Sequence, residues 1–208
     1  LHSFPTRRSS DLEIYLTCFT YEYFMPFIFE KLELSEIISI KSSSFLDSRG
    51  YFLESFRESD FISNGINTRF TQDNFSHSIQ GTLRGLHYQQ NPKAQAKLVF
   101  CMRGEIFDVA VDIRKKSPTF GKWIGKILSE SNHELLYIPE GFAHGFCVLS
   151  DEADVLYKVN QEYSPEHDRG ILWKDPTINI SWPIKNLILS EKDLVLPLLK
   201  DADLNFVY

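Results

Sequence analysis

An alternation of apolar and polar side chains runs along residues 105–114. Every odd position from 107 to 113 is apolar, and polar side chains stand at Asp108, Asp112 and Arg114. A period of two is typical of a β-strand with one buried face and one face in water. We therefore expect a strand here whose odd-numbered side chains are buried.

Four further strand-like runs follow at residues 123–128, 134–138, 144–149 and 155–159. Glycine, proline and short polar stretches separate them. Many short strands at this spacing predict an all-β sandwich or jelly-roll barrel. Only two short helices are expected, one near residues 59–63 and one that begins at Ser190. With 208 residues and 43% hydrophobic content, the chain can bury one substantial core.

The N-terminal stretch needs a separate interpretation. Residues 1–10 have no strand or helix period and resemble translated adapter sequence. Glu22 and Pro26 interrupt the apolar run at residues 14–29, which leaves it short of the ~18 residues of a membrane helix. We expect residues 1–31 to be a non-native or disordered extension, no membrane role, and a single domain over residues 32–208.

Charge and cysteine content exclude several classes of protein. The net charge is −6 and no lysine- or arginine-rich stripe is present, which argues against a nucleic-acid binder. The three cysteines form no Cys-x-x-Cys pair, so a disulfide framework or a cysteine zinc site is not expected. This pattern fits a reduced, cytoplasmic protein.

Two glycine-punctuated segments, residues 81–89 and 139–146, each deliver one histidine. His87 and His144 lie far apart in the sequence, and only a folded barrel could bring them together. Histidine exchanges protons near neutral pH, so a small-molecule site on β-strands is predicted. The alternative for either residue is a hydrogen-bonded structural histidine.

Three other side chains are candidates from their positions. Lys97 shares a strand face with apolar neighbours, so it either reaches to the rim or faces a ligand. Tyr157 alternates with two valines and should point inward, as a proton donor or as an ordinary core tyrosine. Asp193 fits a capping box that begins at Ser190, or it orients a catalytic imidazole.

The spacing around the two histidines resembles the two halves of the cupin signature. Metal-binding cupins carry a second histidine two residues after the first, and here that position is Gln89. Two imidazoles without a third anionic ligand are too few for a convincing zinc or iron site. Proton transfer without a metal is therefore predicted.

Residues 34–201 resemble the dTDP-4-dehydrorhamnose 3,5-epimerase family. The matching stretches occur in the family's order, and they are residues 47–52, 72–74, 84–89, 95–99, 104–114, 117–121, 138–146, 156–158 and 190–193. The resemblance implies a cupin-type jelly-roll β-barrel, also called a double-stranded β-helix, that works without metal or cofactor. It also implies a homodimer.

The family converts dTDP-4-dehydro-6-deoxy-D-glucose to dTDP-4-dehydro-L-rhamnose by moving protons at C3 and C5. By the resemblance, His87 is the base and Asp193 holds its tautomer. Tyr157 is the acid on the opposite face, and Lys97 stabilises the enolate.

The resemblance also implies a set of residues that contact the dTDP-4-keto-6-deoxy sugar. They are Arg49, Glu54, Gln72, Asn74, Arg84, His144, Tyr163, Asp168 and Lys192. Arginine and lysine suit a diphosphate, although the arginines could instead pair with Asp47 or Glu54 at the surface. The chain departs from the family at Glu162, where a second aromatic is expected, and at Asp168, where glutamate is common.

Other functions fit the same barrel. A relative could epimerise one carbon only, and a cupin ketoisomerase would move the carbonyl with a similar histidine. A non-catalytic sugar-binding cupin would be expected to lack at least one of the proton-transfer residues, and none is missing here.

Overall fold

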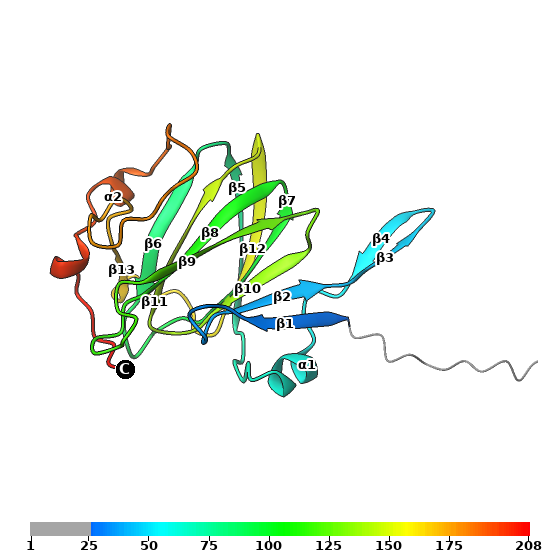
Figure 1. Cartoon of the computed structure of the whole chain (residues 1–208), viewed down its shortest axis with the longest axis horizontal. Coiled ribbons are helices and arrows are strands. Elements are labelled where there is room, and N and C mark those ends of the chain that lie inside the picture. Colours follow the sequence, from blue (N-terminus) through cyan, green and yellow to red (C-terminus); the bar gives the residue numbers. More distant parts are fainter. Residues whose placement is uncertain (1–25) are drawn as a thin grey trace, which may run out of the picture.

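The computed structural model describes residues 26–208 and consists mainly of antiparallel β-strands (Figure 1). The strands are β1 (Phe27–Lys31), β2 (Ile38–Ser42), β3 (Ser44–Asp47), β4 (Gly50–Leu53), β5 (Gln72–Ile79), β6 (Leu83–Gln89), β7 (Lys97–Arg103), β8 (Glu105–Asp112), β9 (Trp123–Ser129), β10 (Glu134–Ile138), β11 (Phe142–Val148), β12 (Glu152–Val159) and β13 (Asp168–Gly170). The helices are α1 (Glu58–Ser63), α2 (Glu191–Leu194) and the 3₁₀ turn η1 (Leu199–Asp201).

Two sheets pack face to face. One has the order β1-β2-β10-β7-β12-β5 and the other the order β13-β6-β11-β8-β9, while β3 and β4 form a separate hairpin. Neighbours in the order are mostly distant in sequence, so the chain crosses repeatedly between the sheets, as in a jelly roll. The predicted all-β jelly roll is confirmed.

The inner faces of both sheets form one hydrophobic core. Val99 and Val155 come from the six-stranded sheet, and Phe142 and Phe146 from the five-stranded sheet, all at 5% exposure or less. These residues occupy alternate positions on their strands, which is the period expected from the sequence.

Strand β8 corrects one prediction, because both of its faces are buried. Val109 and Val111 pack outside the barrel against the C-terminal segment that contains Leu204 and Phe206. The even-numbered side chains, among them Asp108, therefore turn toward the barrel interior instead of water, and Asp108 has no exposed surface. The alternation identified the strand, but it assigned the polar face to the wrong side.

The expected domain boundary at residue 32 also differs from the structure. Residues 27–31 form β1, which pairs with β2 in register from Phe27 to Lys31, and Phe27 is buried. The sheet therefore includes residues that we assigned to the N-terminal extension. The rest of that prediction concerns residues 1–25, which lie outside the described residues.

Both predicted short helices are confirmed. Helix α1 covers the outer face of the six-stranded sheet through Phe61, whose burial at 1% exposure contributes about 2 kcal/mol. Helix α2 begins after Ser190, whose hydroxyl accepts a hydrogen bond from the backbone N–H of Asp193 at 3.2 Å. Among residues 26–208 no helix is long and apolar enough to cross a membrane.

The β3–β4 hairpin extends away from the barrel (Figure 1). It exposes apolar side chains, with Leu46 at 81% and Phe52 at 65%. Because monomeric domains rarely hold several large apolar residues in water on a projecting arm, this hairpin is a candidate contact surface.

Candidate functional site

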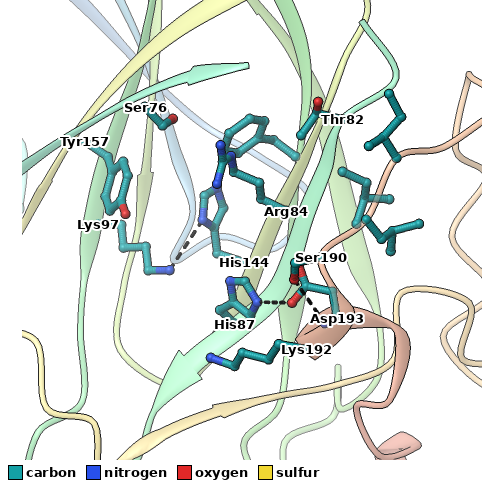
Figure 2. A pocket seen from close by; sticks show the side chains of 14 residues that line it. Ser76, Thr82, Arg84, His87, Lys97, His144, Tyr157, Ser190, Lys192 and Asp193 are labelled. Carbon is teal, nitrogen blue, oxygen red and sulfur yellow. Dashed lines mark hydrogen bonds and ion pairs between the residues drawn. The ribbon is translucent and has the colours of Figure 1, made fainter. Parts of the chain in front are cut away.

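A cavity of about 390 Å³ opens between the two sheets, and a second of about 290 Å³ adjoins it. Eleven of the thirteen predicted site residues line one cavity or both. The first is lined by Arg84, His87, Lys97, His144, Tyr157, Lys192 and Asp193. The second adds Gln72, Asn74, Tyr163 and Asp168. Figure 2 shows most of the first set converging on one space from different strands.

His87 and Asp193 form a hydrogen-bonded pair on one wall. Nε2 of His87 lies 2.6 Å from Oδ1 of Asp193, and the Asp193 side chain is only 4% exposed. Burial tends to raise the pKa of Asp193, but the hydrogen bond and charge of His87, together with hydrogen bonds from Ser190 and Gly85, outweigh it and hold the pKa below its ordinary value. Asp193 is therefore an ionised acceptor at neutral pH, which places the imidazole proton on Nε2 and leaves Nδ1 unprotonated.

A close backbone approach sets the two histidine strands side by side. His144 on β11 is in register with His87 on β6, and the register shifts just beyond, between His144 and Phe146. Gly85 has φ +132° there, and a Cβ on it would lie 2.5 Å from the Cα of Gly145. Glycine is required at Gly85 on both grounds.

Lys97 and His144 line the first cavity and are both buried. Nζ of Lys97 is 3.4 Å from Nδ1 of His144, and Nε2 of His144 is 2.9 Å from Oδ2 of Asp108. Burial lowers the pKa of Lys97 to about 8, although Asp108 and Asp168 oppose the shift. Burial, opposed by Asp108, also lowers the pKa of His144, so the imidazole is neutral at neutral pH.

Tyr157 stands on the wall opposite His87. It comes from β12 of the six-stranded sheet, whereas His87 comes from β6 of the five-stranded sheet, and Figure 2 shows the two side chains on opposite sides of the cavity. Burial is the main cause that raises the pKa of Tyr157, with Arg84 opposing it, so the phenol keeps its proton at neutral pH. An imidazole and a protonated phenol therefore face the cavity from opposite sides.

The second cavity is lined by polar and charged groups. Lys192 forms an ion pair with Asp168, whose Oδ2 also accepts a hydrogen bond from the Tyr163 hydroxyl at 3.2 Å. Gln72 accepts from the backbone N–H of Tyr163 at 2.9 Å and donates to Asn74 at 2.7 Å. This end suits a polar, anionic portion of a ligand.

Arg49 and Glu54 lie outside both cavities. Arg49 is on the β3–β4 hairpin and pairs with Asp47 at 2.5 Å, with its side chain 87% exposed. Glu54 follows the hairpin and pairs with Arg57 at 2.5 Å. The surface pairing with Asp47 that the sequence suggested for Arg49 is thus present. A substrate contact by Arg49 or Glu54 would require a cavity other than the two in the same chain.

Gln89 stands at the position where metal-binding cupins have a ligand, and its side chain forms hydrogen bonds with backbone groups. Its amide donates to the carbonyl of Lys93 at 2.8 Å and accepts from the N–H of Ser164 at 2.7 Å. Within residues 26–208, no three His, Cys, Asp or Glu side chains form a group that could hold a metal ion.

Two residues of the site were missed from the sequence. Asp108 was placed on a solvent face, and only the pairing of β8 with β11 reveals that it meets His144. Ser76 lines the first cavity, and its buried hydroxyl has no partner among the described residues. The alternation Gln72, Asn74, Ser76 along β5 is the signal that could have identified it.

Known proteins resemble this chain in sequence. A sequence model described as dTDP-4-dehydrorhamnose 3,5-epimerase matches residues 31–201. The dTDP-4-dehydrorhamnose 3,5-epimerase of Shigella flexneri is 55% identical over 174 residues, which is 83% of this chain and 96% of that protein.

Two solved structures are similar as well. The dTDP-6-deoxy-D-glucose-3,5-epimerase of Legionella pneumophila, solved with dTDP-4-keto-L-rhamnose, has a TM-score of 0.83 and 46% identity, covering 85% of this chain and 95% of that one. A 3′-monoepimerase of Streptomyces bikiniensis, solved with dTDP-quinovose, has a TM-score of 0.78 and 32% identity, covering 82% and 87%.

Proposed function

The chain belongs to the dTDP-4-dehydrorhamnose 3,5-epimerase family, and we propose that His87, Lys97, Tyr157 and Asp193 carry out its reaction. The enzyme is an epimerase that converts dTDP-4-dehydro-6-deoxy-D-glucose to dTDP-4-dehydro-L-rhamnose. The observation that carries the assignment of residues is the placement of His87 and Tyr157 on opposite walls of one cavity, with Lys97 lining it as well.

Proton removal is the role of His87. A hydrogen beside the 4-keto group is acidic because the resulting carbanion is an enolate. The hydrogen bond to Asp193 keeps the imidazole proton on Nε2, so Nδ1 takes the proton from C3 and, in a separate step, from C5. Asp193 also stabilises the imidazolium that forms.

Charge stabilisation and proton return fall to the opposite sheet. When the C–H bond breaks, its electron pair moves into the C=C bond of the enolate and negative charge gathers on O4, where the Lys97 ammonium stabilises it. Tyr157 then gives its proton to the carbon from the other face, which inverts the centre. Exchange with solvent reprotonates the tyrosinate and deprotonates the imidazolium.

The nucleotide diphosphate fits the rest of the cavities. Arg84 and Lys192 line the same space as His87 and offer charge-assisted donors to phosphate oxygens. Tyr163 is 58% exposed at the edge of the second cavity and offers an aromatic face to the base. Gln72, Asn74, His144 and Asp168 complete the proposed contacts.

Proton NMR in deuterium oxide with dTDP-4-keto-6-deoxyglucose tests this assignment. Deuterium should enter at both C3 and C5, and the His87→Ala protein should remain folded but show no exchange. Turnover that survives in folded His87→Ala would overturn the base assignment. Exchange at a single carbon would indicate a single-centre epimerase, and a shifted carbonyl would indicate a ketoisomerase.

We also propose that the enzyme is a metal-free cytoplasmic homodimer. Cys101 and Cys147 are free and buried, in keeping with a reducing compartment. The exposed apolar arm β3–β4 supports a dimer, because a second copy could bury Leu46 and Phe52. In such a dimer the arm would carry Arg49 toward the partner's cavity, which accounts for its distance from the cavity of its own chain.

A further inference from the structure

Three buried polar groups form a line that runs from the wall of the first cavity into the protein. Lys97 on β7, His144 on β11 and Asp108 on β8 are joined by contacts of 3.4 Å and 2.9 Å. All three are at most 8% exposed. Figure 2 shows the first of these contacts, with the Lys97 ammonium directed at the His144 ring.

The protons on this line can be assigned from donor and acceptor chemistry. An ammonium group can only donate, so Nδ1 of His144 must be the acceptor from Lys97. The single proton of the neutral ring then lies on Nε2 and is donated to Asp108. The line therefore carries one positive charge at Lys97, one negative charge at Asp108 and a neutral imidazole between them.

Asp108 is otherwise poorly compensated. Its Oδ2 accepts from His144, while Oδ1 is buried without a hydrogen-bond partner among the described residues. A buried carboxylate is costly unless a counter-charge lies nearby, and one neutral imidazole is a weak partner. This orphaned oxygen indicates that the charge of Asp108 is retained for its effect on a neighbouring cation.

We propose that Asp108 is a positioning residue that acts through His144: it fixes the tautomer of that ring and supplies the counter-charge that keeps Lys97 an ammonium in the resting enzyme. This inference rests on the proposed function in one respect: the charge of Lys97 matters for the reaction because Lys97 stabilises the enolate. Asp108 does not touch the substrate space, since it lines neither cavity.

The electrostatics around Lys97 agree with this role. Burial lowers the pKa of Lys97 to about 8, and Asp108 is the largest influence that opposes the shift, followed by Asp168. Asp168 already forms an ion pair with Lys192, whereas Asp108 has no other cationic partner among the described residues. The other titratable side chains that line the cavities with Lys97 are Arg84, His87, Tyr88, His144, Tyr157, Tyr163, Lys192 and Asp193.

Asp108→Asn separates charge from geometry. Because Lys97 donates to Nδ1 of His144, the ring proton stays on Nε2 and the amide oxygen accepts from it, so the ring keeps its place while the negative charge is removed. NMR titration of isotope-labelled lysine in the free enzyme, with the Lys97 signal identified by its absence in Lys97→Met, should show the midpoint falling by about one pH unit or more. The alkaline limb of kcat/KM should move down by the same amount. An unchanged midpoint would overturn the proposal.

Asp112→Asn is the matched control. Asp112 is a buried carboxylate on the same strand, but it binds Arg114, Ser117 and Thr119 at the far end. We expect this variant to lose stability and leave the Lys97 midpoint in place. An equal shift in Asp112→Asn would mean that loosening of β8, and not the charge of Asp108, moves the midpoint.

A second measurement needs no variant and covers the case in which Asp108→Asn fails to fold. Nitrogen NMR of labelled histidine in the unmodified enzyme should show His144 neutral, with its proton on Nε2. A proton on Nδ1 would contradict the proposal, because that nitrogen could not then accept from Lys97. Both NMR readouts are independent of turnover, so they stand or fall separately from the deuterium-exchange test of the reaction.

Discussion

Nε2 of His87 lies 2.6 Å from Oδ1 of Asp193, a residue 106 positions further along the chain. The backbone N–H of Asp193 also donates to the Ser190 hydroxyl that caps helix α2, so one residue both completes the helix cap and holds the imidazole. From the sequence, Asp193 was interpreted either as part of a helix cap or as the partner of a catalytic imidazole. Both contacts are present, because the backbone N–H makes the first and the carboxylate makes the second.

Asp193→Asn should remove most of the activity while leaving the fold intact. The amide can turn its NH₂ toward Nε2, which moves the imidazole proton to Nδ1 and blocks the base. We expect exchange at C3 to slow by roughly 10²- to 10⁴-fold, the usual contribution of a general base. The rate of deuterium entry, with circular dichroism as a fold check, measures this loss.

Ser190→Ala is the control for the cap. It removes the hydroxyl that caps α2 and should cost about 1 kcal/mol of stability, but it leaves the carboxylate of Asp193 beside His87. If Ser190→Ala lost as much exchange as Asp193→Asn, the effect would belong to the helix and not to the tautomer.

Tyr157→Phe should uncouple proton exchange from inversion. The ring stays packed on the inner face of β12, so the cavity keeps its shape while the proton donor is lost. His87 can still remove a proton and return a deuteron to the same face. NMR should therefore show deuterium entering the substrate with little epimer formed, and inversion at the wild-type rate would remove Tyr157 from the mechanism.

Rising pH should act in opposite directions on activity and on stability through Lys97. Its ammonium is lost as pH rises through about 8, so kcat/KM should fall there. The unfolded chain keeps its lysine protonated up to its ordinary pKa of 10.5, so it binds more protons than the folded state between these values, and the free energy of unfolding rises with pH by up to about 3 kcal/mol from this group.

The comparison that isolates this effect is wild type against Lys97→Met in denaturant titrations from pH 7 to about 10. The free energy of unfolding of wild type should rise relative to that of Lys97→Met as the pH rises, because the methionine variant lacks the group that titrates. A wild-type stability that gains nothing over Lys97→Met across this window would show that Lys97 titrates at its ordinary pKa.

Strand β8 was predictable from its period of two, and β9 to β12 from apolar runs between turn residues. The inward direction of Tyr157 was predictable from its alternation with two valines. Periodicity divides a strand into two faces without saying which is inside when both are covered, and this is why Asp108 was misplaced. Burial of the outer face of β8 depends on Leu204 and Phe206, which lie almost a hundred residues away and whose docking no local pattern reports. The resemblance to a family supplied Arg49 as a site residue, but only the structure places it on a projecting arm.

Subunit mixing should reveal whether Arg49 acts in the partner's cavity. Arg49→Ala leaves His87 intact, and His87→Ala leaves the arm intact, so each variant alone should have little activity. If the arm crosses to the partner, a mixed dimer contains one cavity with both residues intact. Equal mixing yields about half mixed dimers, so activity should return to about a quarter of wild type.

The matched control is a mixture of Asp193→Asn with His87→Ala. Both side chains belong to the same cavity of the same chain, so a mixed dimer has no intact site and should regain nothing. Light scattering supplies the oligomeric state, with Leu46→Asp on the arm expected to give a monomer because a charge replaces an exposed apolar contact. A wild-type monomer, or mixing that restores no activity with Arg49→Ala, would confine Arg49 to its surface pair with Asp47.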